Sequence, residues 1–470
     1  MRAGRIVVLV ALVVGLMATP AYATPHFVVG QGQNPGVAID GAGTAYIGWQ
    51  VNTHADAGDS VQLCVLPKGA RACASLATIA FPGTGFDNGR VSVLLPAPGV
   101  VQVAVGRNLQ NVYGYYLGTS VDGGAPFNAP IRIGGQFAKR AELLPGGLIA
   151  AQGDDVRTLS GAILRPDGSD AQTEPAVLGE RAQFSDVTVQ GGGVYIAGSL
   201  AGPTSVAHLP AGAASTDPAA WQALPDIVEG DVPRLAPGPA GPLVLMQSNV
   251  PGSAALFVRH WTGTAWTPHL TIGPDNVSQP YAITGAGPRV VAGWARNLPS
   301  SGYLVQFASS LDGGALWSTT ATLAVKDDAP QSLEAAIDPG GSGVLVGGGS
   351  FEDTPIEVFQ VDPHRAKVAR ARFGSTTVQL RADDGDCIPD TQLSLRVQAA
   401  RGGVLVGPGT VLRAARISVS RSRVERRGRW TLLVDLRRSR AKRTATVRLV
   451  PRHGRARTLR LPVRGCGRLA

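Results

Sequence analysis

Cysteine, aromatic side chains and charged side chains are all scarce in this chain of 470 residues. Four cysteines are present, aromatic residues make up 6% and charged residues 16%. No CxxC pair or paired histidine accompanies the cysteines, which excludes the ordinary ligand spacings of a zinc site. The seven histidines form no HxH or HExxH motif, and the chain has no Gly-x-Ser-x-Gly elbow. We therefore expect no metal and no cofactor.

Signals for helices and for membrane spans are also missing. The chain contains 61 glycines and 34 prolines, which interrupt it every few residues. After residue 18, no apolar run approaches the ~18 uninterrupted residues of a membrane helix. The sequence therefore predicts an all-β protein without an integral membrane segment in its mature form.

The start of the chain has the features of a secretory leader. Arg2 and Arg5 precede an apolar stretch over residues 6–18, and Ala21-Tyr22-Ala23 offers a small-x-small cleavage site. The stretch is short for a membrane span, although an uncleaved anchor is the alternative. We predict a signal peptide over residues 1–23 and a secreted, extracellular protein.

A strand–turn–strand pattern recurs through the following part of the chain. Its copies begin at Val37, Val91, Ala141, Val187, Leu235, Tyr281 and Leu333. Another pair of strands fits between successive copies, so each repeat holds about four strands. Repeats of roughly 40–50 residues with this content are typical of propeller blades. We predict a seven-bladed β-propeller over residues 24–378, with the strand at residues 26–30 completing the last blade beside residues 356–362.

Two short peptides share the pattern Ser-x-Asp-x-Gly-x-x-aromatic, and each follows an apolar strand. The first contains Ser120, Asp122, Gly124 and Phe127, and the second contains Ser310, Asp312, Gly314 and Trp317. In such a turn, Asp accepts backbone N–H bonds, Gly adopts a positive φ, and the aromatic ring packs back onto the hairpin. The pattern resembles the Asp-box, or BNR repeat, of sialidase-like β-propellers. That resemblance implies that each turn joins the third and fourth strands of a blade, on the face away from the active site. Sialidase catalytic domains have six blades, so six is the alternative count.

The same resemblance defines what a catalytic site would need. Sialidases bind the sugar carboxylate with three arginines, and use a Tyr–Glu nucleophile and an Asp acid/base. The first arginine belongs to a Phe/Tyr-Arg-Ile-Pro motif, which is absent here. The weak candidates just before inner strands are Arg90, Arg140, Arg234, Asp87, Asp186 and Asp231. Such a set suits an anionic sugar, and it equally suits solvated loop ends. Tyr281 alone among the tyrosines lies near an inner-strand start, so the resemblance favours a non-catalytic member.

The cysteines fit an exported protein whose bridges are local. Four cysteines allow three pairings. Pairing Cys64 with Cys73 and Cys387 with Cys466 keeps each bridge within one candidate domain. We predict these two disulfides, with loop closure of the shorter one contributing about 2.7 kcal/mol.

Charge separates the end of the chain from the rest. Residues 391–470 hold 21 Lys and Arg but only two acids, Glu425 and Asp435. Period-two alternation is clear in several strands of this part, among them residues 392–399 and 445–451. We predict a small immunoglobulin-like β-sandwich over residues 379–470, linked through the acidic residues 383–386, which lack the full pattern of a calcium loop.

The basic module has three interpretations. It could bind anionic polymers of the cell envelope by charge attraction, it could bind nucleic acid, or its arginines could simply be solvated outer faces. Nucleic acid is disfavoured by export and by the near absence of aromatic side chains for stacking, with Trp430 alone among them.

Together these features predict a secreted, non-catalytic binding protein that recognises a glycan or another envelope component. We expect a monomer with no nucleic-acid partner. The alternative is a glycoside hydrolase of sialidase-like type, so whether the protein is an enzyme stays open at this point.

Overall fold

The computed structural model describes residues 26–464 apart from 52–59, 83–89, 110–111, 136, 154–157, 181–183, 200–202, 249–254, 274–276, 298–301, 319, 350–352, 362–368, 384–391, 403, 421–422, 427 and 436–441. Within these ranges the chain is all-β, as predicted, with short 3-10 turns at η1 (Pro218–Ala220) and η3 (Pro408–Thr410). Among these residues, none of the helices has the length and apolar character needed to span a membrane.

The first part of the described chain forms seven four-stranded antiparallel sheets. The first three are β2 (Gln33–Ile39), β3 (Ala45–Val51), β4 (Ser60–Leu66) and β5 (Ser75–Ala80); β6 (Ser92–Ala97), β7 (Val100–Leu109), β8 (Val112–Ser120) and β9 (Ile131–Gly134); and β10 (Phe137–Leu143), β11 (Ile149–Gly153), β12 (Thr158–Leu164) and β13 (Ala176–Glu180). Each sheet is a simple meander, because consecutive strands pair with one another.

The remaining four sheets repeat this order. They are β14 (Phe184–Gln190), β15 (Gly193–Ser199), β16 (Thr204–Leu209) and β17 (Gln222–Ile227); β18 (Gly230–Ala236), β19 (Leu243–Ser248), β20 (Leu256–His260) and β21 (Leu270–Gly273); β22 (Val277–Ala286), β23 (Arg289–Asn297), β24 (Tyr303–Ser310) and β25 (Ala321–Lys326); and β26 (Ser332–Ile337), β27 (Gly343–Gly348), β28 (Pro355–Val361) and β1 (His26–Gln31).

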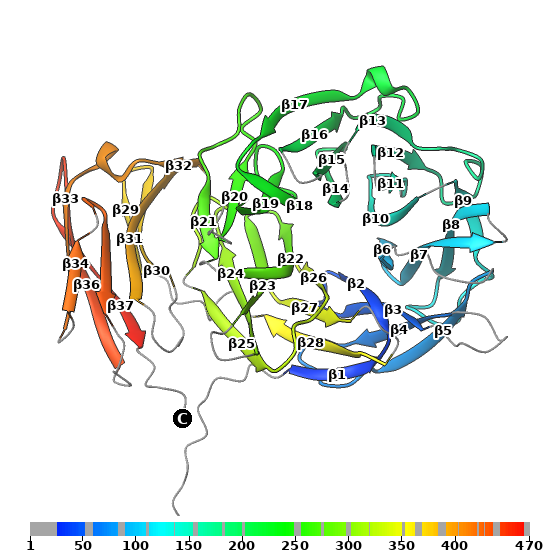
Figure 1. Ribbon diagram of the computed structural model, residues 1–470, viewed down its shortest axis with the longest axis horizontal. Helices are drawn as coiled ribbons and strands as arrows, with labels where there is room; N and C mark the ends of the chain where they lie inside the picture. The colour runs from blue at the N-terminus through cyan, green and yellow to red at the C-terminus, as the bar shows by residue number, and fades with distance from the viewer. Residues whose placement is uncertain are drawn as a thin grey trace, which may run out of the picture.

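The sheets are arranged as a ring around a central axis, which is the arrangement of a β-propeller (Figure 1). The first strand of each sheet lies innermost, and each contacts the first strand of the next sheet, from β2 through β26 and back to β2. The ring closes because β1 is the outer strand of the last sheet, where His26 pairs with Phe359 of β28. This closure agrees with the sequence prediction for residues 26–30.

Apolar layers between neighbouring sheets hold the ring together. One such core joins the β18 and β22 sheets through Leu245, Tyr281 and Trp294, all buried. Because each sheet is covered on both faces, whole strands are buried, as in β27. Close packing also explains Gly293, where an added Cβ would lie 2.4 Å from Leu345 of the next sheet. Glycine is therefore needed there for sheet contact rather than for a turn.

The two Ser-x-Asp-x-Gly turns lie between the third and fourth strands of their sheets and share the hydrogen bonds of their serines. The Oγ atoms of Ser120 and Ser310 accept hydrogen bonds from the backbone N–H groups two and four residues later. In the second turn, the Asp312 carboxylate also accepts from the N–H of Leu316 at 2.9 Å. The Trp317 indole donates to the carbonyl of Gly314 at 2.8 Å. The side-chain bonds of Ser, Asp and Trp therefore close the second turn from within.

The predicted disulfide between Cys64 and Cys73 is present, with a Cα–Cα distance of 5.4 Å. Cys64 lies on β4, and Cys73 lies in the connection to β5. The bridge therefore clamps the two outer strands of the first sheet. Cys387 and Cys466 lie outside the described residues, so their pairing stays a prediction.

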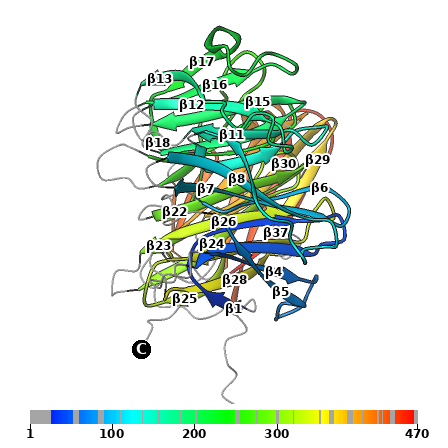
Figure 2. The same cartoon turned by 90° about the vertical axis from the view of Figure 1, so that its right-hand side faces the viewer.

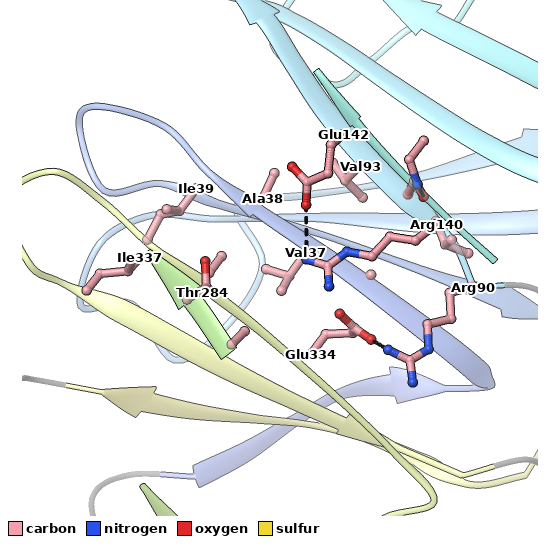
Figure 3. Close-up of a pocket in the computed structure, with 16 residues that line it drawn as sticks. Val37, Ala38, Ile39, Arg90, Val93, Arg140, Glu142, Thr284, Glu334 and Ile337 are labelled. Carbon is pink, nitrogen blue, oxygen red and sulfur yellow. Dashed lines mark hydrogen bonds and ion pairs between the residues drawn. The ribbon is translucent and has the colours of Figure 1, made fainter. Parts of the chain in front are cut away.

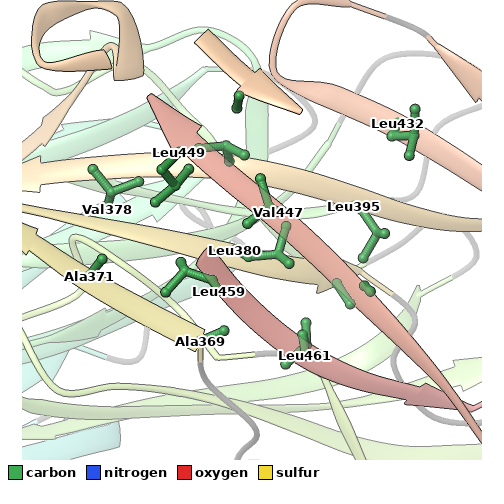
Figure 4. Close-up of a cluster of buried hydrophobic side chains, with 14 of the residues drawn as sticks. Ala369, Ala371, Val378, Leu380, Leu395, Leu432, Val447, Leu449, Leu459 and Leu461 are labelled. Atoms are coloured by element: carbon green, nitrogen blue, oxygen red, sulfur yellow. The ribbon is translucent and has the colours of Figure 1, made fainter. Parts of the chain in front are cut away.

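The C-terminal part forms two further sheets that share one apolar core. The first contains β29 (Ala369–Phe373), β30 (Thr376–Asp383), β31 (Gln392–Arg401), β35 (Thr431–Asp435) and β34 (Arg423–Arg426), with β32 (Val404–Val406) beside β31; the second contains β33 (Leu412–Val419), β36 (Lys442–Pro451) and β37 (Arg457–Arg464). Val378, Leu380, Val447 and Leu461 meet between the two sheets (Figure 4). We call residues 369–464 the C-terminal module.

The start of this module corrects the predicted boundary. Residues 378 and 379 fall inside β30, which pairs along its length with β31. The β29–β30 hairpin turns at Gly374, whose φ is +59°, and its strands bury their apolar side against the module's core. The C-terminal sheets therefore begin at Ala369 rather than at residue 379.

The module lies against the outer side of the propeller, beside the β18 and β22 sheets (Figures 1 and 2). Arg381 is only 1% exposed. Its guanidinium donates to the carbonyls of Thr271 at 3.0 Å and Ile272 at 2.8 Å. The Gln379 amide donates to the carbonyl of Trp317 in the second Ser-x-Asp turn. That turn therefore contributes to the contact between propeller and module.

Candidate ligand site in the central channel

The inner strands and the residues just before them direct charged side chains into the central channel. Arg90 precedes β6, Arg140 lies on β10, Asp186 on β14 and Arg234 on β18. First and third strands of each antiparallel sheet run in the same direction. The Ser-x-Asp turns follow third strands, so they lie at the end of the propeller where the inner strands finish.

Arg140 joins two carboxylates across neighbouring sheets. Its guanidinium lies 3.0 Å from Asp186 on β14 and 3.1 Å from Glu142 on its own strand. Burial lowers the pKa of Arg140, but the attraction of Asp186 and Glu142 outweighs burial and raises the pKa overall. Asp186 is almost fully buried, and it also accepts from the N–H of Leu235 at 2.8 Å. This aspartate therefore connects three successive sheets.

Arg90 forms a second ion pair, with Glu334 of β26 (Figure 3). Burial lowers the pKa of Arg90 well below its ordinary value, and repulsion from Arg234 and Arg140 lowers it further, against attraction from Asp186. These influences show that the three arginines lie near one another. The pair links the second sheet to the last one, on the other side of β2.

Arg234 has no ion-pair partner within the described residues. Its Nε donates to the carbonyl of Tyr281 at 3.3 Å, and its Nη1 donates to the carbonyl of Pro233 at 3.4 Å. Burial lowers the pKa of Arg234, and nearby Asp186 only partly opposes this effect. Arg234 is therefore the arginine of the cluster whose charge is compensated least.

Tyr281 is fully engaged by the backbone. Its hydroxyl donates toward the carbonyls of Asp231, at 3.1 Å, and Val232, and it accepts from the N–H of Gln247 at 3.1 Å. Burial raises the pKa of this phenol. A neutral phenol held in this way is a poor nucleophile, so Tyr281 acts as a structural link between sheets.

Asp231 lies beside this link and supports an unusual backbone conformation. Val232 has a φ of +53°, which is rare for a β-branched residue. Its N–H donates to Asp231 at 2.7 Å and to the hydroxyl of Ser199 at 3.0 Å. The Asp231 carboxylate therefore helps to hold the backbone of Val232 in this conformation. Asp87, the remaining candidate, lies outside the described residues.

The sequence analysis missed Glu142 and Glu334. Both come directly after the predicted strand starts, Ala141 and Leu333, so a search of the residues before those starts passes over them. The alternation of a strand places residues i and i+2 on one face, which puts Glu142 on the same face as Arg140. That periodicity was the available signal for Glu142, whereas the Arg90–Glu334 contact depends on ring closure.

The channel contains a cavity of about 180 Å³. Arg90, Arg140, Glu142 and Glu334 contribute its charged atoms, and apolar residues such as Ile39 and Ile337 line the rest (Figure 3). Burial raises the pKa of Glu142, an effect that Arg140 partly opposes. This volume is below the ~300 Å³ of small drug-sized pockets, so the cavity suits a single small unit such as one sugar ring.

Fixed donors and acceptors side by side are what a hydroxyl-rich ligand requires. Arginines offer several N–H donors each, and the ionised carboxylates offer only acceptors. Among the described residues, no group of three His, Cys, Asp or Glu side chains is placed to hold a metal ion. The described residues of the channel therefore offer hydrogen bonds and charge pairing to a ligand.

Comparisons with known proteins give fold neighbours only. No protein-family model matches the chain, and no curated protein matches it. Among solved structures, the chain is similar to a Trypanosoma rangeli sialidase in complex with the inhibitor DANA, with 10% identity, a TM-score of 0.40, and coverage of 93% of this chain and 88% of the sialidase.

Two further solved structures resemble this chain at similarly low identity. An α-L-arabinofuranosidase from Fusarium graminearum has 10% identity and a TM-score of 0.42, over 73% of this chain and 98% of that one. A gluconolactonase from Xanthomonas campestris has 12% identity and a TM-score of 0.34, over 72% and 98%. At such scores these likenesses carry no inference about the ligand or activity of this chain.

Proposed function

We propose that this chain is an exported, non-catalytic, seven-bladed β-propeller that binds a glycan or another envelope component in its central channel. The two Ser-x-Asp turns, at Ser120–Phe127 and Ser310–Trp317, are proposed as Asp-boxes because they share the sequence pattern, the place after a third strand and the two hydrogen bonds to the serine Oγ. The C-terminal module is proposed as an immunoglobulin-like sandwich that acts as a separate basic unit. Export rests on the leader features of residues 1–23.

The single observation that carries the binding proposal is the mixed lining of the channel. Arg90, Arg140, Glu142 and Glu334 surround one small cavity and are held in place by ion pairs. Preorganised polar groups bind hydroxyl-rich ligands without a large ordering cost. A lining with arginines and carboxylates in equal number favours a ligand rich in hydroxyl groups over a highly charged one.

Three features support the absence of catalysis. Tyr281 is buried and hydrogen-bonded to backbone groups, so it offers no nucleophile. Arg90 and Arg140 are each occupied by carboxylates, whereas a sugar carboxylate would need open guanidinium groups. The Phe/Tyr-Arg-Ile-Pro motif of sialidases is also absent.

The test is glycan binding by the mature chain, compared between two Glu→Gln variants. Glu142→Gln changes a channel carboxylate, and Glu229→Gln changes a carboxylate that pairs with Arg259 on β20. A glycan array identifies a ligand, and calorimetric titration with that ligand measures the affinity. We expect Glu142→Gln to weaken binding at least tenfold, about 1.4 kcal/mol, and Glu229→Gln to leave it unchanged. Equal effects of both variants, or no glycan bound at all, would sink the proposal.

A glycoside hydrolase is the second candidate, and Glu142 is the observation that favours it. Glycosidases use two carboxyl groups, one of them protonated as the general acid. Burial raises the pKa of Glu142, and Asp186 forms an ion pair with the same Arg140 guanidinium that Glu142 contacts. Release of 4-methylumbelliferone from sialoside and common glycoside substrates, lost in Glu142→Gln, would establish this function in place of simple binding.

A further inference from the structure

A second cavity, separate from the channel, lies in the C-terminal module. It has a volume of about 310 Å³ and opens between β33 and the β34–β35 hairpin. Arg416, Arg426, Arg429 and Thr431 supply its polar lining. Three arginines therefore border one hollow, in a part of the chain (residues 391–470) that holds only two acids.

Two of the three arginines are positioned by neutral groups. Arg429 donates to the backbone carbonyl of Arg413, and its guanidinium lies 5.2 Å from the ring centroid of Trp430. Arg426 donates to the carbonyl of Gly428 at 3.4 Å. Neither carbonyls nor an aromatic ring cancel a full charge. Among the residues that the structure describes, Arg416, Arg426 and Arg429 make no ion pair, so the cavity keeps a strong positive charge.

The adjoining sheet adds to this charge instead of relieving it. Arg416 on β33 is directly opposite Arg448 on β36, and both side chains are exposed. Like charges opposite one another destabilise an antiparallel pair. The strands β33, β36 and β37 contain no acidic residue. An anion bound beside Arg416 would relieve this repulsion, so the module gains stability from such a ligand.

The ligand class follows from what surrounds the arginines. The planar guanidinium matches carboxylate, sulfate and phosphate groups bidentately. None of the residues that line the cavity is aromatic, and Arg429 lies over the ring of Trp430, its neighbour in sequence. The described lining therefore has no stacking platform for nucleic-acid bases. The large apolar side chains exposed in the described chain, such as Val177 and Val228, all belong to the propeller. The module therefore has no described apolar anchor for a membrane.

We propose that the cavity bordered by Arg416, Arg426 and Arg429 binds the anionic groups of an acidic polysaccharide. Its volume reaches the lower end of the range for small-ligand sites, which is enough for one charged sugar unit of a longer chain. The neighbouring Arg448 extends the positive surface along the polymer. This site is independent of the channel, so it stands or falls separately from the function proposed above.

The test is binding of polygalacturonate to the full mature chain at low and high salt. Arg416→Gln/Arg426→Gln removes two cavity charges, and the matched control Arg455→Gln/Arg460→Gln removes two exposed charges elsewhere in the module. We expect the first pair to weaken binding more than tenfold and the control to weaken it less than threefold. Equal losses would show that only diffuse charge attracts the polymer, and would overturn the site.

A charge-preserving variant and two other polyanions complete the experiment. Arg416→Lys/Arg426→Lys keeps the charge but loses the bidentate geometry, so we expect an intermediate loss while thermal unfolding stays unchanged. Wild-type affinity in this Lys variant would contradict a geometric site. Tighter binding of single-stranded DNA, or of phosphatidylglycerol vesicles, than of polygalacturonate would overturn the assignment to a polysaccharide.

Discussion

At the scale of single residues, two arginine–aspartate pairs of this protein differ sharply in their surroundings. Arg140 and Asp186 have side-chain exposures of 18% and 1%, whereas Arg165 and Asp170 have 61% and 19%. Water screens the charges of the exposed Arg165–Asp170 pair but hardly reaches the Arg140–Asp186 pair. The two ion pairs therefore contribute differently to stability. Breaking a buried pair leaves a charge without compensation, while an exposed pair contributes little.

We therefore predict that Arg140→Met lowers the unfolding free energy by about 3–5 kcal/mol. Arg165→Met is the control and should cost less than about 1 kcal/mol. Urea denaturation monitored by tryptophan fluorescence measures both. Similar small losses for the two variants would show that the Asp186 carboxylate finds other compensation, for example from the N–H of Leu235.

His260 gives the protein a sensitivity to acid. The residue is 5% exposed, and its Nε2 has no hydrogen-bond partner among the described residues. It lines a small cavity with Leu405 of the C-terminal module. Burial lowers the pKa of His260 below its ordinary value of 6.5. The unfolded chain therefore takes up a proton at a higher pH than the folded protein does.

The sign of the effect follows from proton linkage. Between pH 6.5 and the lower pKa of the folded state, the unfolded chain binds more protons, so stability falls as the pH falls. We predict that His260→Phe reduces this loss, while the exposed His453→Gln variant keeps the wild-type slope. Thermal unfolding measured from pH 5 to pH 8 checks this, and identical slopes for wild type and His260→Phe would refute it.

Residue patterns predicted part of the channel. Arg90, Arg140, Asp186 and Arg234 were identified because each precedes a predicted strand start, and the structure brings these four together. Arg140, Asp186 and Arg234 in fact lie within inner strands, which begin earlier than predicted. Their partners could not be derived in the same way. Arg90 and its partner Glu334 are more than 200 positions apart in the sequence. They come close in space only when the ring closes.

At the scale of elements, the Ser-x-Asp turns show how one hydroxyl organises a loop. Ser310 is fully buried, and its Oγ accepts from the N–H groups of Asp312 and Gly314 at 3.3 and 2.9 Å. Removing the hydroxyl leaves both N–H groups unsatisfied next to the interface with the module.

We predict that Ser310→Ala costs about 1–3 kcal/mol of stability, since buried donors lose their acceptor. The control is Ser205→Ala, where an exposed hydroxyl bonds Asp226 at 2.9 Å, and it should cost less than about 0.5 kcal/mol. Chemical denaturation provides the comparison. A neutral Ser310→Ala variant would mean that the turn is held by Asp312 and Trp317 alone.

Strand alternation predicted most of the C-terminal strands but misplaced where the module begins. Residues 392–399 and 445–451 were identified from period-two patterns and lie in β31 and β36. The boundary was inferred from the change of charge and from the acidic residues 383–386. The β29–β30 hairpin precedes that change, and only its pairing with β31 assigns it to the module. Strand partners are a tertiary property that composition does not encode.

At the scale of the whole molecule, the repeat spacing was sufficient to predict the ring, because a regular succession of strand pairs has few ways to bury both faces. The contact between propeller and module was not predictable. It depends on Arg381, a charged residue that is buried only because two carbonyls of β21 are placed to receive it. Nothing in the local sequence distinguishes this arginine from its solvated neighbours.

We predict that Arg381→Met uncouples the two parts. Charge-assisted hydrogen bonds contribute about 1.5–3 kcal/mol each, and the variant loses two of them at this interface. Calorimetry should then resolve separate unfolding transitions for propeller and module. The control Arg372→Met, an exposed position on β29, should keep the wild-type profile. An unchanged profile for Arg381→Met would show that Leu405 and Gln379 suffice to hold the module.

The place of β1 has a consequence for biosynthesis. The segment that completes the last sheet is made first, and its partner β28 follows some three hundred positions later. While the chain is being synthesised, Phe27 and Val28 have no strand partner until Glu357 and Val358 have been added. A nascent chain that stops before β28 therefore leaves β1 and β27 with unpaired edges, and the ring closes only after β28 has been made.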